Sequence, residues 1–435
     1  MTHTLIGLIT GEAIVHHSRP SGQGLSAPLR RGLLLAVAVI GSNAPDLDLL
    51  YTYQGTSTSS LRYVLWHRGY THTVIGCLAL ALLLYGGVRA WLAWKNLKPS
   101  PRDCGLLLGT AILATALHLG MDYLNSYGVH PFWPAENRWT YGDAVFIIEP
   151  LYWVAAAPLF FRLRSLTARV LFGAALTAAV VLGAATHLVT STLCVMLAAA
   201  ILLSLALGAH VTARSAARIS AAAALGVTLV FVLAGQIAAR RAEALARGAF
   251  AGDRMLDHVL TPLPVNPICW DLLLLETHQD RYVARHATLA LAPRFLGAAQ
   301  CPTLAAPQHT APLRPVVAPD TGAVHWLGEF AVPQADFIAL LADHCDAAAF
   351  MRFARAPFLA TVGPKAVPGA RSTGAVTEVL GDLRFDRGRN GGGLDVRLEI
   401  PGSTPGGSSG IDPDGARPRC ERAAPWSAPR ADLLR

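Results

Sequence analysis

Apolar runs long enough to cross a bilayer fill much of the first half of the chain and stop near residue 240. Six runs are of this kind: residues 74–92, 104–121, 144–161, 170–188, 191–209 and 219–239. A helix of about 20 apolar residues covers the hydrocarbon core of a membrane. Two shorter apolar stretches, residues 4–15 and 32–44, come before them. The first half therefore predicts a multi-pass helical membrane domain.

The second half has ordinary polarity and a different periodicity. Residues 282–291 and 324–332 alternate well enough to be strands, and residues 377–385 and 394–400 are further strand candidates. Residues 335–355 are expected to form a helix. The predicted fold class is mainly α: a multi-pass helical membrane domain with a C-terminal soluble α+β domain.

This pattern divides the chain into four parts. A first helical membrane domain covers residues 1–165, and additional transmembrane helices cover residues 166–245. The soluble α+β domain is expected at residues 255–400. Residues 401–435 are rich in Gly, Ser, Pro and Arg, with few large apolar side chains, and are predicted to be disordered.

Charge adds an orientation. Only 15% of the 435 residues are charged, and the net charge is +8. Basic residues gather in the connections at 95–102, 162–169 and 211–218, which the positive-inside rule assigns to the cytoplasm. The polar second half would then lie outside, where its four cysteines could form disulfides. No dense basic stripe with interleaved aromatics is present, which argues against nucleic acid as a partner.

The chemistry-bearing residues gather at the ends of the apolar runs. Asp46 and Asp48 follow one run, and Trp66–Thr73, with the sequence WHRGYTHT, comes just before another. His118 and Asp122 are four residues apart near the end of a third run, and so share one helical face. Polar and ionisable residues at such places are costly and indicate function.

Alternating spans would bring these residues to one membrane face, because each span that ends there is followed by one that begins there. Eight residues are expected near one level: Asp46, Asp48, His67, His72, His118, Asp122, Asp143 and Glu149. His3 can join them if the first short helix starts at that face. Asp143 could instead be a helix N-cap. Glu149 could merely satisfy backbone groups freed by Pro150.

Mixed imidazole and carboxylate ligands suit Zn, Mn or Fe and do not suit calcium. Several acids with several histidines fit two ions better than one. Arg68, beside the ligands, could bind an anionic group on the substrate. Because His67 and His72 are five positions apart, the two cannot share a helix face. Either His67 lies in a loop, or only one of them binds metal.

Several motifs together resemble a known family. They are THTLIG at residues 2–7, APDLD at 44–48, HRGYTHT at 67–73, HLGMDYLNSYG at 118–128 and GDAVFIIEP at 142–150. In combination, the chain resembles the bacterial YdjM/YbcI-like membrane-bound metal-dependent hydrolases over about residues 1–160. Segments at 262–270, 326–330 and 381–386 also resemble the extra C-terminal domain of some members.

The resemblance implies an integral protein of the bacterial inner membrane, a divalent-metal site and a hydrolase activity. Its ligand candidates fall on His3, Asp46, Asp48, His67, His72, His118 and Asp122. We assign His67 and Arg68 to catalysis and the other six to one or two ions, Zn or Mn. Glu149 stands where an Asp is common, which weakens its case as a ligand.

Two functions remain open. In the first, water activated by the metal attacks an ester or phosphoester in a small molecule or a membrane lipid, with His67 or a free carboxylate as base. In the second, the protein is a non-catalytic, metal-stabilised scaffold or transport component. An open coordination position would favour catalysis, and a closed four-ligand site would favour a structural role.

Overall fold

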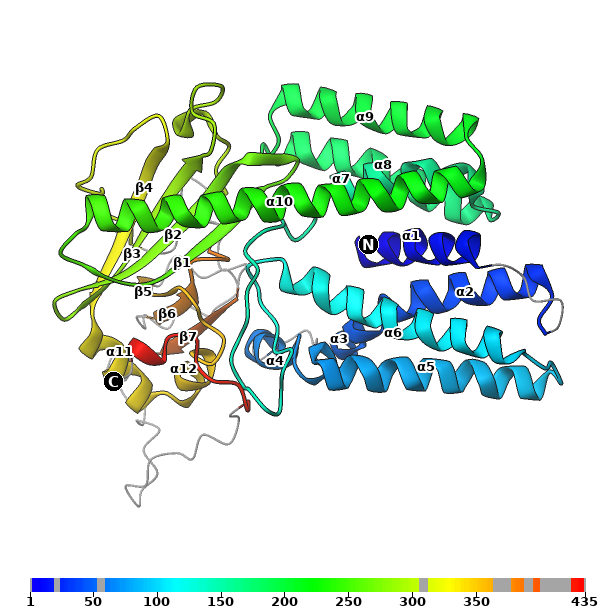
Figure 1. Ribbon diagram of the computed structural model, residues 1–435. Helices are drawn as coiled ribbons and strands as arrows, with labels where there is room; N and C mark the ends of the chain where they lie inside the picture. Colours follow the sequence, from blue (N-terminus) through cyan, green and yellow to red (C-terminus); the bar gives the residue numbers. More distant parts are fainter. Residues whose placement is uncertain are drawn as a thin grey trace, which may run out of the picture.

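The computed structural model describes residues 2–18, 24–52, 59–304, 312–362, 377–386, 394–399 and 424–433. A helical region and a β-rich C-terminal domain lie end to end, and the long helix α10 runs across both (Figure 1). The helical region begins with α1 (Thr2–His17), α2 (Ala27–Gly41), η1 (Ala44–Asp48), α3 (Leu49–Thr52), α4 (Ser59–Trp66) and η2 (Tyr70–His72). It continues with α5 (Val74–Trp94), α6 (Pro101–Tyr123), α7 (Leu151–Ala156), η3 (Ala157–Arg162), α8 (Leu166–Ala185), α9 (Ser191–His210) and α10 (Ala213–Ala249).

Five of the described helices are long and apolar enough to cross a membrane: α5, α6, α8, α9 and α10. A Ser or Thr side chain accepts a backbone N–H bond at the start of each of them, which satisfies one of the free donors of the first turn. The multi-pass prediction is therefore confirmed. A sixth span arises if α2 and the segment Ala44–Thr52, which meet at 54°, are counted together.

The expected span at residues 144–161 is wrong. Its first residues are not helical, and the helical part covers only Leu151–Arg162. Pro150 occupies the N-cap of α7, and a second proline, Pro158, lies at the start of η3. At about 1.5 Å per residue, this piece is shorter than the roughly 30 Å hydrocarbon core.

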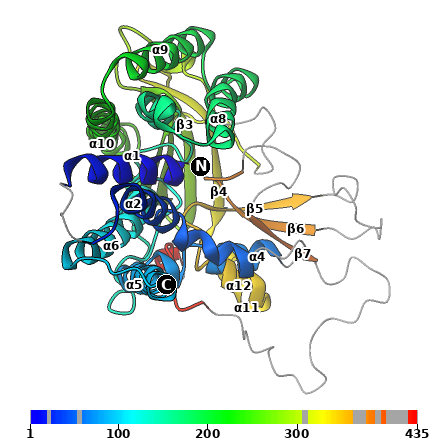
Figure 2. The ribbon, with the colours of Figure 1, turned by 90° about the vertical axis from the view of Figure 1, so that its right-hand side faces the viewer.

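The C-terminal domain contains two antiparallel sheets, which confirms the α+β prediction. The first, in the order β1-β2-β3-β4, contains β1 (Arg254–Leu263), β2 (Asn266–His278), β3 (Arg281–Ala290) and β4 (Val324–Pro333). The second, in the order β5-β6-β7, contains β5 (Pro357–Val362), β6 (Thr377–Asp382) and β7 (Asp395–Glu399) and projects to one side (Figure 2). The short elements are η4 (Ala298–Gln300), α11 (Gln334–Asp343), α12 (Cys345–Phe350) and η5 (Ala431–Leu433).

The expected single helix at 335–355 is broken. His344 has an extended backbone and separates α11 from α12. The strands β1, β2 and β5 were not anticipated. Much of β2 is buried, so its apolar run Leu272–Leu275 does not alternate with polar residues.

Helix α10 ties the two regions together. Its 37 residues measure about 55 Å, well beyond the thickness of a bilayer core. The C-terminal part of α10, which extends beyond the bilayer core, packs on β1 and β2. There Ala238 and Ala242 contact Trp270 and Leu272 in a fully buried cluster. The sheet is therefore fixed to the membrane region by a continuous helix.

The end of the chain is ordered where it is described, which corrects part of the prediction of a disordered tail. Residues 401–423 lie outside the described residues, but residues 424–433 pack against the helical region. Trp426 is fully buried. Its indole N–H donates to the carbonyl of Leu65 (2.6 Å), and its ring stacks on His130 at 4.0 Å.

Glu149 joins the two regions from the other side. Its buried carboxylate accepts hydrogen bonds from the backbone N–H groups of Leu151 (3.0 Å) and Val265 (3.2 Å). Burial raises the pKa of Glu149 to about 8, although these hydrogen bonds act in the opposite direction. The folded protein therefore holds a proton here that the unfolded chain releases near pH 4.5.

This difference predicts a pH-dependent stability. Between about pH 5 and 8, the wild-type protein should lose stability as pH rises, because the folded state must give up a proton that the unfolded state has already lost. Glu149→Gln should reduce this slope by up to about 1.4 kcal/mol per pH unit. Thermal unfolding in detergent at a series of pH values measures it. If the stability of the wild type and of Glu149→Gln changed with pH by the same amount, a raised pKa of Glu149 would be excluded.

Candidate metal centre

Three elements bring acids and histidines to the end of the helical region that faces the C-terminal domain (Figure 1). The 3-10 helix η1 carries Asp46 and Asp48 at the bend after α2, and η2 ends at His72. His118 and Asp122 lie one turn apart near the end of α6. The predicted convergence of alternating helices is thus present for these five residues.

Four of these residues direct one donor atom each to a common point: Asp46, His72, His118 and Asp122. The two Nε2 atoms of the histidines are 3.1 Å apart. Asp122 Oδ2 is 3.1 Å from His72 Nε2 and 3.3 Å from His118 Nε2. Asp46 Oδ1 is 3.5 Å from each of the same two nitrogens.

These separations fit a tetrahedral metal site. Ligand atoms about 2.0–2.1 Å from a zinc ion stand roughly 3.3 Å from one another. The buried Oδ2 of Asp122 also has no hydrogen-bond partner among the described residues, an arrangement that is costly unless a cation binds there. The donor set of two imidazoles and two carboxylates therefore fits a Zn- or Mn-type ion.

Neighbouring groups orient both imidazoles. His118 Nδ1 donates to the carbonyl of Ser42 at 2.8 Å, which leaves Nε2 with its lone pair toward the cluster. His72 Nδ1 lies 3.0 Å from the Thr71 hydroxyl and 3.3 Å from Asp48 Oδ2. Partners of this kind fix the tautomer and the ring direction of metal-binding histidines.

The cluster also attracts positive charge. Burial by itself lowers the pKa of His72, but the close carboxylates of Asp122, Asp46 and Asp48 outweigh burial and raise this pKa to about 10. Three carboxylates thus draw a proton onto a fully buried ring. The same carboxylates would attract a divalent cation.

A second group of candidate ligands shares Asp46 with the first. It comprises Asp46, Asp48 and His67, whose donor atoms also lie within 4.8 Å of one another. His67 Nδ1 is 2.9 Å from Asp48 Oδ1. Asp48 thus lies between the two histidines of the WHRGYTHT segment. Oδ1 contacts His67, which follows α4, and Oδ2 contacts His72, at the end of η2.

Arg68 faces inward. Its Nη2 donates to Asp122 Oδ1 (2.9 Å), and its Nη1 donates to Asn125 Oδ1 (2.9 Å) and the carbonyl of Asp122 (3.2 Å). Its backbone has a positive φ of 60°, and its N–H donates to Asp48 Oδ2 at 3.0 Å. The guanidinium expected to bind an anionic substrate is instead bound to the protein.

His3 lies beside the four-residue cluster. Its Nε2 is 3.3 Å from Asp122 Oδ1, and its ring stacks on His118 at 3.9 Å. It therefore contacts the carboxylate oxygen that faces away from the two imidazole nitrogens. The position follows from the close packing of α1 on α2, where a Cβ on Gly7 would lie 2.2 Å from Ser42 Oγ.

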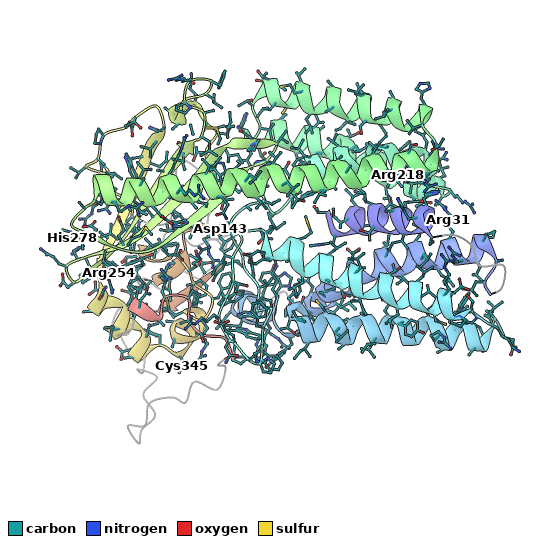
Figure 3. All side chains as sticks on the ribbon, in the orientation of Figure 1. Arg31, Asp143, Arg218, Arg254, His278 and Cys345 are labelled. Atoms are coloured by element: carbon teal, nitrogen blue, oxygen red, sulfur yellow. A yellow bond between two sulfur atoms is a disulfide. The ribbon has the colours of Figure 1, made fainter. Side chains whose placement is uncertain are left out.

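The other two acids of the expected constellation point elsewhere. Asp143 pairs with Arg355 at 2.9 Å, at the junction with the C-terminal domain (Figure 3). Glu149 bonds Leu151 and Val265, as described above. The prediction of eight converging residues is therefore wrong for these two, since the C-terminal domain supplies their partners.

Sequence reasoning did not identify Asn125. This residue lies three positions after Asp122 in the segment HLGMDYLNSYG, and its Oδ1 accepts hydrogen bonds from Arg68 Nη1 and the Tyr127 N–H, each 2.9 Å. It is buried beside a charged pair. A polar amide just past a ligand-bearing helix was the available signal.

A family model matches the N-terminal part of the chain. Residues 1–188 match the model of the YdjM inner membrane protein family. The N-terminal part is YdjM-like. No curated protein and no solved structure matches the chain. The YdjM-like part includes all four residues of the cluster and ends just after α8, before the C-terminal domain.

Metal analysis of the purified protein tests the cluster. His118→Ala should lower the bound Zn or Mn at least tenfold, because it removes a donor from the four-residue set. His210→Ala is the matched control, since His210 is exposed at the end of α9. Elemental analysis after dialysis against each metal gives the occupancy. Equal metal content in the two variants would exclude this site.

Proposed function

We propose that the protein is a membrane-embedded hydrolase that depends on a divalent metal and acts on an ester or phosphoester. Asp46, His72, His118 and Asp122 would hold the ion, Zn or Mn. The supporting observation is that the two imidazole Nε2 atoms are 3.1 Å apart and that one oxygen of Asp46 and one of Asp122 lie 3.1–3.5 Å from both. A neighbouring group also orients each imidazole. When bound, such a metal polarises a carbonyl or phosphoryl oxygen and lowers the pKa of water.

His67 is the best candidate for the general base. Its Nδ1 is 2.9 Å from Asp48 Oδ1, so the carboxylate orients the ring and favours the Nδ1–H tautomer. The opposite nitrogen can then accept a proton from water. The alternative role of His67, with Asp46 and Asp48, is to hold a second ion.

The approach to the site favours a substrate with an apolar part. Asp46 is the most exposed residue of the four-residue cluster, with 30% of its side chain accessible. Around it, Leu47, Leu50 and Tyr51 expose large apolar side chains. A membrane lipid or another amphiphile would place its headgroup at the cluster and its chains on this surface.

The second candidate is a structural role for the metal. Four protein donors at tetrahedral spacing resemble a closed site, and structural zinc sites have this form. The non-catalytic scaffold or transport component thus remains the competing function. Substitution of His67 distinguishes the catalytic role from the structural one, because His67 lies outside the four-residue set and its loss leaves those four donors in place.

His67→Ala should lower the turnover number by at least 10²-fold while the metal of the four-residue set stays bound. The assay uses a panel of p-nitrophenyl esters, p-nitrophenyl phosphodiesters and a fluorogenic phospholipid in detergent. Asp46→Asn serves for comparison and should lose both metal and activity. Full metal occupancy in the wild type without hydrolysis of any panel substrate would favour the structural role.

We also propose that the metal centre and the C-terminal domain face the extracytoplasmic side. The α5–α6 and α9–α10 connections, which carry basic residues, lie at the opposite end (Figure 1). Arg31 and Arg218 also lie at that end (Figure 3). In the C-terminal domain, Cys269 and Cys301 form a disulfide, whereas Cys77, Cys104 and Cys194 of the helical region are free. Disulfides persist outside the cytoplasm.

Cysteine labelling in intact cells tests the orientation. A single cysteine introduced at exposed Phe295, on the side of Cys269 and Cys301, should react with a membrane-impermeant maleimide. A single cysteine at exposed Arg214 should react only after the membrane is opened. Both variants carry Cys104→Ser to remove the partly exposed native thiol. The reverse pattern would place the domain in the cytoplasm.

A further inference from the structure

Arg384 is a buried arginine of the C-terminal domain that lies against the loop after α6. It follows β6 and exposes 1% of its side chain. Asp382 binds one edge of the guanidinium, at 3.0 Å from Nε and 2.7 Å from Nη2. Nη1 donates to the carbonyls of Ser126 (2.8 Å) and Tyr127 (3.2 Å). One arginine thus joins its own domain to the loop that follows Asp122.

From this loop, a short series of hydrogen bonds leads to the metal centre. The N–H of Tyr127 donates to Asn125 Oδ1, and the same oxygen accepts from Arg68 Nη1. Arg68 Nη2 donates to Asp122 Oδ1. Asn125, Arg68 and Asp122 are all buried, so water does not compete strongly for these bonds.

Arg355 provides a contrast in the same interface. It is another buried arginine of the C-terminal domain, and it binds Asp143 (2.9 Å), Asp257 (2.8 Å) and the carbonyl of His258 (3.0 Å). None of these hydrogen bonds involves residues 125–127. The side chain of Arg355 therefore attaches the domain to the helical region through other partners than Arg384 does, although the backbone N–H of Arg355 also donates to Asp382 (2.8 Å). The substitution Arg355→Lys keeps this backbone bond.

We propose that Arg384 is a positioning residue for Asp122. By fixing the loop at Ser126 and Tyr127, it holds Asn125 in place as an acceptor for Arg68. Arg68 in turn binds Asp122 Oδ1 and leaves Oδ2 toward His72 and His118. The proposal rests on the metal centre proposed above, and it gives the C-terminal domain a part in completing that centre from outside the YdjM-like region.

The substitution Arg384→Lys tests this proposal, because it keeps the positive charge and removes the planar guanidinium. A lysine can still pair with Asp382, but one ammonium cannot also reach both carbonyls and Phe353 as the planar guanidinium does. Arg355→Lys is the matched control. Asn125→Ala and the double variant Arg384→Lys/Asn125→Ala complete a double-mutant cycle.

Two measurements on the full chain in detergent are needed. The first is hydrogen exchange of the metal-free proteins, in which amides of residues 67–73 and 125–127 should exchange faster in Arg384→Lys than in Arg355→Lys. The second is Co²⁺ titration followed by visible absorption. Co²⁺ affinity should fall about tenfold in Arg384→Lys and less than twofold in Arg355→Lys. The double variant should be no weaker than Asn125→Ala alone.

Equal exchange in the two lysine variants, or additive losses in the cycle, would overturn the proposal. If the wild-type protein binds no Co²⁺, Zn or Mn, the proposed metal centre itself fails. The exchange measurement still decides in that case whether Arg384 orders the two segments.

Discussion

The buried ion pair between Arg68 and Asp122 is the contact on which the candidate site depends. It joins the WHRGYTHT segment to α6 at 2.9 Å, with both side chains withdrawn from solvent. Removing one partner of a buried ion pair typically costs about 3–5 kcal/mol, because the other charge is left uncompensated. The pair also orients the Asp122 carboxylate. Oδ1 accepts a hydrogen bond from Arg68, and Oδ2 faces the imidazoles of His72 and His118.

The C-terminal domain belongs to the same folded body as this pair. One large core cluster combines Leu65 of α4 and Tyr127 of the loop after α6 with Phe353 and Trp426. Arg68 also lies over the Tyr127 ring at 4.7 Å. The residues behind the candidate metal centre are therefore packed partly by the helical region and partly by the C-terminal domain.

Hydropathy and spacing were sufficient to predict most of the helices and the meeting of Asp46, His72, His118 and Asp122. Those features depend on local signals: the length of apolar runs and the four-residue spacing of His118 and Asp122. The partners of Asp143 and Glu149 could not be predicted in this way, because Arg355 and Val265 lie more than 100 residues away. The contacts of Arg68 with Asp122 and Asn125 could not be predicted either, because these partners lie more than 50 residues away. The position of Arg68 in the sequence does not show whether its charge faces a bound ligand or the protein interior.

The position of Trp426 has a consequence for biosynthesis. This side chain, close to the C-terminus, fills a place beside Leu65 that is 361 residues earlier in the chain. The segment around Arg68 is therefore synthesised long before its final packing partner exists. The packing of Leu65 against Trp426 can therefore form only after the chain has been extended by 361 residues beyond Leu65.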